Sequence, residues 1–151
     1  MSPPTEWGPP VWTLFHTFAE KINPNKFSEL EPQFFFYIKR ICSSLPCPDC
    51  SQHATTFLAR VNFNGIKNKE DLQNLLYIFH NVVNRRKNKP LFNREQVTNV
   101  YANKNTINVY NNFISVYQTK GNLKLLADSF QRRLILQDFK KWVIANIRSF
   151  V

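Results

Sequence analysis

The sequence predicts an all-α fold from three observations. Apolar residues recur every three or four positions over most of the 151 residues, which is the spacing of a helix with one buried face. Hydrophobic residues make up 43% of the chain and charged residues 20%, so one domain can bury a core without disulfide bonds. Proline, asparagine and glycine lie between the periodic segments and mark their ends. We expect four core helices, a short fifth helix and an appended C-terminal helical pair.

The first two helices have start and stop signals. Pro9 and Pro10 suit a first helical turn, where a missing backbone N–H costs little, and Asn23-Pro24 ends the segment. Ser28 and Glu31 fit a capping box at the start of the second helix. Leu45-Pro46 ends that helix, because the residue before a proline avoids helical geometry.

Three more core helices follow. The third covers about 47–61 and is followed by a turn over 62–65, where asparagine and glycine gather. The fourth covers about 68–86, with an asparagine side chain as its N-terminal cap. The short fifth helix covers about 94–101.

We divide the chain into a domain over 1–104 and a helical extension over 105–151. The extension shows two helical patterns, over about 107–121 and about 123–147. A strand over Val109-Tyr110 is the alternative to the first pattern, but the length of the pattern favours a helix. Amphipathic helices of this length bury an apolar face, so we expect the extension to pack on the core or on a partner.

The second half of the chain is basic. The first 75 residues carry seven basic and seven acidic side chains, whereas the other 76 carry thirteen and three and account for the net charge of +10. This half therefore faces a phosphate-bearing cofactor, an acidic partner or nucleic acid, or else it forms a solvated basic face. A nucleic-acid-binding arm would be a denser basic block, so we do not expect nucleic-acid binding.

Several classes of protein are excluded. No apolar run approaches the roughly 20 residues of a membrane span. The N-terminus lacks the basic start and apolar stretch of a secretory signal. Three cysteines within nine residues are an odd and local set rather than a disulfide framework. Integral membrane, collagen-like and disulfide-scaffold proteins do not fit.

The cysteines point to a local chemical site. Cys47 and Cys50 form a C-x-x-C motif, which serves either as a redox disulfide or as part of a metal site. The motif stands at a predicted helix N-terminus, where unpaired N–H groups stabilise a thiolate. Cys42 falls on the apolar face of the second helix, so we expect a buried core cysteine, with a resolving thiol as the alternative.

A zinc site is the competing interpretation. Cys42, Cys47, Cys50 and His53 offer four ligands, although all four would lie in one helix–turn–helix corner. Structural zinc sites usually combine two neighbouring ligands with a distant second pair. In this alternative the chain is a zinc-stabilised helical module whose basic half binds nucleic acid.

Two further motifs accompany the C-x-x-C. Trp12 and His16 form a W-x₃-H on one helix face. The segment 80–84, His-Asn-Val-Val-Asn, lies on the fourth helix and is followed by Lys89-Pro90. Together the three motifs resemble the Erv/ALR family of FAD-linked sulfhydryl oxidases, in the compact form found in large nucleocytoplasmic DNA viruses. The resemblance covers about residues 7–101.

The resemblance implies a helical bundle that binds one FAD beside the redox pair and has no metal site. A substrate dithiol would attack Cys47, and Cys50 would pass two electrons to FAD. The reduced flavin would then reduce molecular oxygen to hydrogen peroxide. The FAD-binding residues that the resemblance implies are Gly8, Trp12, His16, Cys50, His53, His80, Asn81, Asn84, Lys87, Lys89 and Tyr101.

The resemblance also carries expectations about partners and stability. Cellular members have a second disulfide that ties down the short fifth helix; it is absent here, so packing or the tail must hold the helix around Tyr101. The implied partners are protein dithiol substrates or a thioredoxin-like carrier, and a second copy in a homodimer. A viral, late-expressed oxidase of this kind would act in the infected-cell cytoplasm or the virion, where disulfides need a dedicated oxidant.

Overall fold

The fold is all-α, as predicted. The computed structural model describes residues 4–118 and 126–151, and these ranges contain helices and no β-strand. The predicted strand alternative at Val109-Tyr110 lies inside a helix. The α-helices are α1 (Pro4–Lys21), α2 (Phe27–Ser43), α3 (Pro48–Ala59), α4 (Lys69–Arg86), α5 (Arg94–Tyr101), α6 (Thr106–Tyr117) and α7 (Leu126–Asn146), and short 3₁₀ turns cover Pro24–Lys26, Phe63–Gly65 and Ile147–Phe150.

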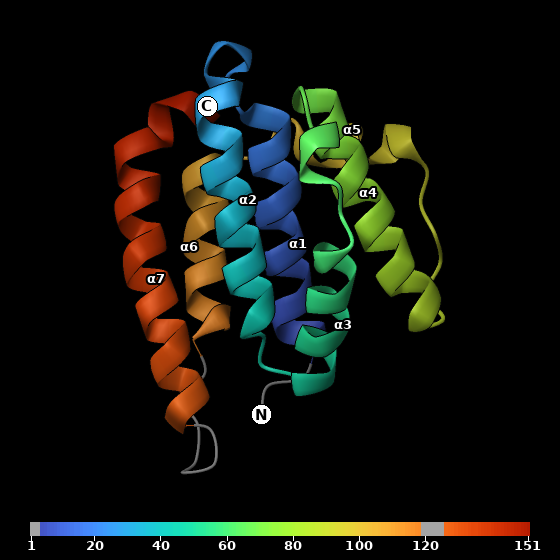
Figure 1. The fold of residues 1–151 in the computed structure, drawn as a ribbon, viewed down its shortest axis with the longest axis vertical. Helices are drawn as coiled ribbons and strands as arrows, with labels where there is room; N and C mark the ends of the chain where they lie inside the picture. The colour runs from blue at the N-terminus through green and yellow to red at the C-terminus, as the bar shows by residue number, and fades with distance from the viewer. Residues whose placement is uncertain (1–3, 119–125) are drawn as a thin grey trace.

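Helix α1 lies at the centre of the molecule. Figure 1 shows α6 and α7 on one side of the α1–α2 pair and α4 and α5 on the other. Residues 14–19 of α1 are all buried, so this part of the helix is enclosed on every side. Helix α6 packs along α1 and α7 packs on α2, and the fully buried Phe113 and Phe139 bring both tail helices into the central hydrophobic core. The division after residue 104 stays a prediction.

The predicted start signals of α1 and α2 are wrong. Helix α1 begins at Pro4, so Pro9 and Pro10 lie inside it rather than in its first turn; burial of Trp7 holds the extra turn against the core. Helix α2 begins at Phe27 and has no side-chain cap. Glu31 of the expected capping box is only 3% exposed, and burial raises its pKa to about 7.

The other boundaries agree closely with the predictions. Asn68 caps α4 by accepting a hydrogen bond of 2.9 Å from the N–H of Asp71, and α5 has the predicted bounds. Helix α3 ends at Ala59, two residues before its expected end. The predicted end at Gly121 and start at Leu123 lie outside the described residues.

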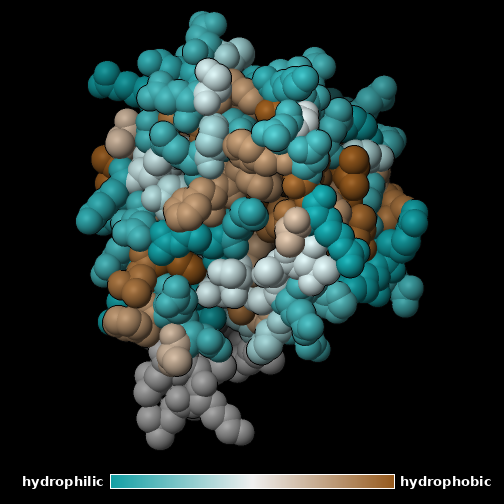
Figure 2. Space-filling view, viewed as in Figure 1, coloured by the Kyte–Doolittle hydropathy of each residue, from teal (hydrophilic) through white to brown (hydrophobic). Residues whose placement is uncertain are grey.

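None of the helices in 4–118 and 126–151 is long and apolar enough to cross a bilayer. Figure 2 shows a largely polar face on which hydrophobic side chains form small groups.

Hydrogen bonds fasten α5 to α1 and α4. The Arg94 guanidinium donates to Gln73 at 2.7 Å and to Asn74 at 2.8 Å, both on α4. Thr98 donates to the Glu20 carboxylate of α1 at 2.7 Å, and Gln73 donates to the same carboxylate at 3.0 Å. Packing and this network therefore hold the short helix where cellular relatives are expected to use a disulfide.

The packing of the tail predicts a large effect for one core substitution. Phe139→Ala removes a fully buried ring from α7 and should lower the free energy of unfolding by about 3–5 kcal/mol. Phe130→Ala, on the same helix but 58% exposed, is the matched control and should change it by less than about 0.5 kcal/mol. Denaturant unfolding measures both; equal stability of the two variants would show that the tail is not part of the core.

Candidate functional site

Cys47 and Cys50 form a disulfide at the start of α3, with Cα atoms 5.2 Å apart. Cys47 is the N-cap residue, and its sulfur accepts a hydrogen bond of 3.3 Å from the N–H of Cys50. Pro48 occupies the first helical position, where its missing N–H leaves no intrahelical bond unmade. A thiolate at Cys47 would face the positive end of the helix dipole.

The two sulfur-bearing residues differ in exposure. Cys47 is partly exposed, whereas Cys50 is 9% exposed and lines a cavity. The outer role of Cys47 and the inner role of Cys50 in the reaction stay predictions. The chain before the disulfide is also held in place, because the N–H of Leu45 donates to Ser51 Oγ at 2.7 Å.

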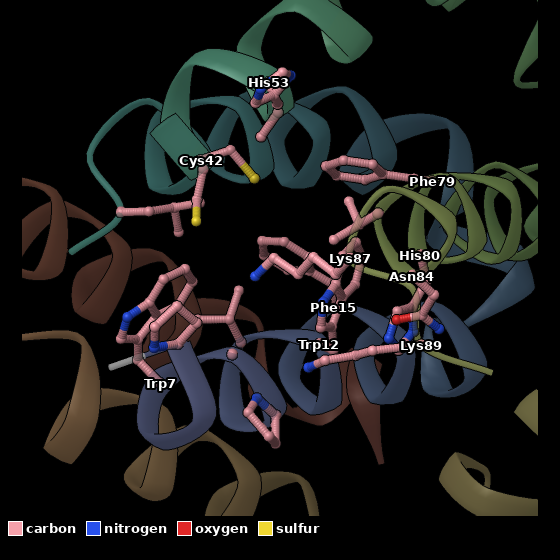
Figure 3. A pocket seen from close by; sticks show the side chains of 18 of the residues that line it. Trp7, Trp12, Phe15, Cys42, His53, Phe79, His80, Asn84, Lys87 and Lys89 are labelled. Atoms are coloured by element: carbon pink, nitrogen blue, oxygen red, sulfur yellow. The ribbon is translucent and has the colours of Figure 1, made fainter. Parts of the chain in front are cut away.

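The cavity lies between α1, α3 and the C-terminal half of α4 and has a volume of about 300 Å³. Figure 3 shows Trp7, Trp12 and Phe15 of α1 on one side, with Cys42 and His53 across from them. The described lining contains no aspartate or glutamate. An apolar, partly aromatic cavity of this kind suits a flat ring system with no positive charge of its own.

Stacked rings form one end of the site. The rings of Trp12 and His80 lie parallel with centroids 4.1 Å apart, and His16 stacks on Tyr101 at 4.6 Å. One ring nitrogen of His16 lies 2.9 Å from one of His80, so one ring donates and the other accepts. Burial, followed by the charges of neighbouring side chains, lowers the pKa of His16 to about 3 and that of His80 to about 4. Both rings are therefore neutral at physiological pH.

The end of α4 places positive charge at the cavity. The N–H groups of Asn88 and Lys89 bond back to Arg85 and Asn84, and Asn88 adopts a left-handed φ of 57°. This is a Schellman C-cap, a conformation that asparagine tolerates better than most residues. Lys87 and Lys89 both line the cavity as a result, and Figure 3 shows Lys87 pointing into it.

These cations repel one another. Burial lowers the pKa of Lys87, and the charges of Lys89 and Arg86 lower it further. All three residues line the cavity, whose described lining holds no acidic side chain to balance them. A bound anion would relieve this repulsion, so the cavity combines an aromatic wall with an anion site.

Most of the predicted cofactor residues meet at this cavity. Those that line it are Gly8, Trp12, Cys50, His53, His80, Asn84, Lys87, Lys89 and Tyr101. His16 lies behind His80, outside the lining. Asn81 also lies outside it, because its amide bonds the backbone N–H and C=O of Phe92 at 3.3 and 2.9 Å.

Sequence reasoning missed several lining residues. Trp7, Val11 and Phe15 follow one face of α1, and Phe79 and Val83 one face of α4. Apolar residues at this spacing indicate a core-facing stripe, and a stripe that faces a cavity has the same pattern. Only the Trp-x₃-His motif beside Phe15 distinguishes this face in the sequence.

Cys42 is buried, as predicted, and is a free thiol that also lines the cavity. Burial raises its pKa well above the ordinary range, which disfavours the reactive thiolate. The described residues hold no group of three or more histidine, cysteine or acidic side chains placed to bind a metal. Because the sulfurs of Cys47 and Cys50 are bonded to each other, they do not act together with Cys42 and His53 as zinc ligands here.

The histidine pair predicts acid sensitivity. As the pH falls from 6.5 to about 3–4, His16 and His80 become protonated in the unfolded chain but stay neutral in the folded chain. Their contribution to stability is therefore complete above pH 6.5 and is lost as the pH falls through this window. Denaturant unfolding of wild type and His80→Phe from pH 7 to pH 4 measures this. The raised pKa of Glu31 acts in the opposite direction but is common to both proteins, so the variant should show the smaller acid-induced loss. Equal losses would contradict the prediction.

Comparison with known proteins finds one matching family and relatives whose names all give the same activity. The Erv1/Alr family matches residues 9–103. The FAD-linked sulfhydryl oxidase of African swine fever virus is 32% identical over 95 residues, which are 63% of this chain and 79% of the viral protein. The putative FAD-linked sulfhydryl oxidase of Invertebrate iridescent virus 3 is 30% identical over 58% of this chain and 60% of its own length. The probable FAD-linked sulfhydryl oxidase of Vaccinia virus is 27% identical over 59% of this chain and 87% of its own length. No solved structure matches the chain significantly.

The family match and the geometry coincide. The matched range runs from α1 to the end of α5 and contains the stacked rings, the cationic end of α4 and the Cys47–Cys50 disulfide. Helices α6 and α7 lie outside it. The chain belongs to the Erv1/Alr family.

Proposed function

We propose that the chain oxidises protein dithiols to disulfides as an FAD-linked sulfhydryl oxidase. One observation carries this function: the disulfide has a partly exposed sulfur-bearing residue on its outer side and a buried one that lines an aromatic, cationic cavity. A redox pair that must receive electrons from a protein and deliver them to a cofactor needs this two-sided placement.

The cavity fits FAD by its chemistry. Trp12, His80 and Tyr101 offer ring faces for the aromatic parts of the cofactor. Lys87 and Lys89, which both line the cavity, would supply cations for the pyrophosphate. When bound beside Cys50, FAD would supply the two-electron chemistry that regenerates the disulfide and transfers the electrons to molecular oxygen, giving hydrogen peroxide.

The cysteines carry out the exchange with substrate. A substrate thiolate attacks the Cys47 sulfur, the disulfide breaks, and Cys50 leaves as a thiolate. The second substrate thiol attacks the mixed disulfide at the substrate sulfur, so a substrate disulfide is released and Cys47 becomes a thiolate. The Cys47–Cys50 pair now holds the two electrons, and Cys50 lines the cavity. The N-terminus of α3 stabilises the Cys47 thiolate both when the disulfide is reduced and when it forms again.

The identity of the substrates is a finer proposal. The relatives named above are all viral, and disulfides formed in a reducing compartment need their own oxidant. We infer that the chain is a late viral product whose substrates, or a thioredoxin-like carrier for them, occur in the infected-cell cytoplasm or the virion.

We also propose a homodimer. Residues 14–19 of α1 are buried within one chain, so a second copy would have to bind a surface of the bundle outside these residues. Sedimentation equilibrium of the purified protein should give a mass of twice 17.8 kDa. A species of 17.8 kDa at micromolar concentration would overturn the homodimer and leave the oxidase proposal intact.

The visible absorption spectrum tests the function. The purified protein should show a flavin spectrum that bleaches with dithiothreitol under anaerobic conditions and returns when air is admitted. Cys50→Ser should keep the flavin and lose dithiol oxidation by at least about 10³-fold, because the inner thiol is missing. Cys42→Ser is the matched control and should retain most of the activity, since the Cys42 thiol is buried outside the disulfide. A colourless protein, or full activity in Cys50→Ser, would sink the proposal.

A further inference from the structure

Helix α2 ends at Ser43, four residues before Cys47 of the redox pair. The last carbonyl groups of a helix lack intrahelical partners and must be satisfied by other donors. Here the hydroxyl of Tyr117, at the end of α6, donates to the carbonyl of Ile41 at 3.0 Å. The N–H of Ser44 donates to the same oxygen at 3.2 Å. Tyr117 is fully buried, so this is an internal contact between the tail and the end of α2.

A second tail residue reaches the same place. Arg132 of α7 donates from Nη1 to the carbonyl of Ser44 at 3.4 Å, and it is only 1% exposed. A buried guanidinium has lost its hydration, so such a group persists only where the surroundings supply acceptors. The carbonyl end of α2 is the negative end of its helix dipole, and a cation beside it is stabilising.

The segment so held leads directly to the disulfide. Ser44 is followed by Leu45, buried Pro46 and Cys47. The N–H of Leu45 is bound from the other side by Ser51 in the first turn of α3. The chain before Cys47 is thus fixed between the tail and α3, with no glycine in it to add freedom.

We infer that the C-terminal helices position the redox pair, with Tyr117 and Arg132 as the positioning residues. This rests on the proposed oxidase function and assigns a role in it to the part of the chain outside the family match. Disulfide exchange needs the attacking sulfur in line with the bond that breaks, so its rate is sensitive to small displacements of Cys47. Arg132 also places a positive charge at the negative end of the α2 dipole, beside Ser44, which precedes Cys47 by three residues.

The test measures exchange at the cysteines themselves. Full-length, FAD-loaded protein is mixed anaerobically with dithiothreitol, and thiols are alkylated at intervals and counted by mass spectrometry. In this reaction one dithiothreitol loses two electrons and two protons and closes its own disulfide, while the Cys47–Cys50 bond breaks and gains them. Equilibration with mixtures of reduced and oxidised dithiothreitol gives the midpoint potential of the pair, a readout that does not depend on oxygen turnover.

Matched variants separate positioning from general stability. Tyr117→Phe removes only the hydroxyl. Tyr37→Phe removes another α2–tail hydrogen bond, the exposed bond of 3.3 Å from Tyr37 to the carbonyl of Asp138. Arg132→Met removes the buried charge, and Arg133→Met removes an exposed charge next to it in the sequence. Arg132→Lys keeps the positive charge.

We expect Tyr117→Phe and Arg132→Met to slow reduction by dithiothreitol about two- to tenfold, the effect of one lost hydrogen bond. Arg132→Met should also make the midpoint potential more negative, and Arg132→Lys should restore it. The two controls should behave as wild type. Wild-type exchange in both tail variants, or equal slowing in the controls, would overturn the inference. If Arg132→Met does not fold, Tyr117→Phe and Arg132→Lys decide. A wild type that exchanges with dithiothreitol but never consumes oxygen would overturn the oxidase function instead.

Discussion

The enclosure of α1 is the constraint on which the rest of the structure depends. Because residues 14–19 are all buried, this helix must satisfy two different neighbours along its length. On one side Trp12 and Phe15 help to form the cavity with α4. On the other, Phe18 packs against Phe139 of the tail. A shift of α1 toward either neighbour would disturb the other, so the cofactor side and the tail side share one rigid element.

The cavity is built for a ligand rather than for the stability of the free chain. Burial, followed by the charges of Lys89 and Arg86, lowers the pKa of Lys87, which opposes folding. Neutral His80 avoids adding a further positive charge beside them. A bound pyrophosphate would convert this repulsion into attraction, so binding and folding are linked: a ligand that binds only the folded state stabilises it.

Features of the structure that depend on local sequence signals were predicted better than features that depend on long-range packing. The cap at Asn68 and the break at Leu45-Pro46 each depend on a few neighbouring residues, and both were predicted. The start of α1 coincides with the burial of Trp7 in the hydrophobic core, which the proline signal does not include, so that signal failed. The meeting of Arg132 with the end of α2 joins positions 88 residues apart, and no short pattern encodes it. The chemical motifs were readable because cofactor chemistry restricts residue type as well as hydrophobicity.

The redox chemistry and the stability of the fold are kept apart. The chain has three cysteines, and its one disulfide closes a loop across a sequence separation of 3, which constrains the unfolded state little. Helix α5 is held by Arg94, Thr98 and their partners, and the tail by buried aromatic rings. Reduction of Cys47 and Cys50 therefore removes no major support of the fold. An enzyme whose own disulfide must open in every cycle gains from this arrangement, because dithiol substrates attack the redox pair without loosening the elements that position it.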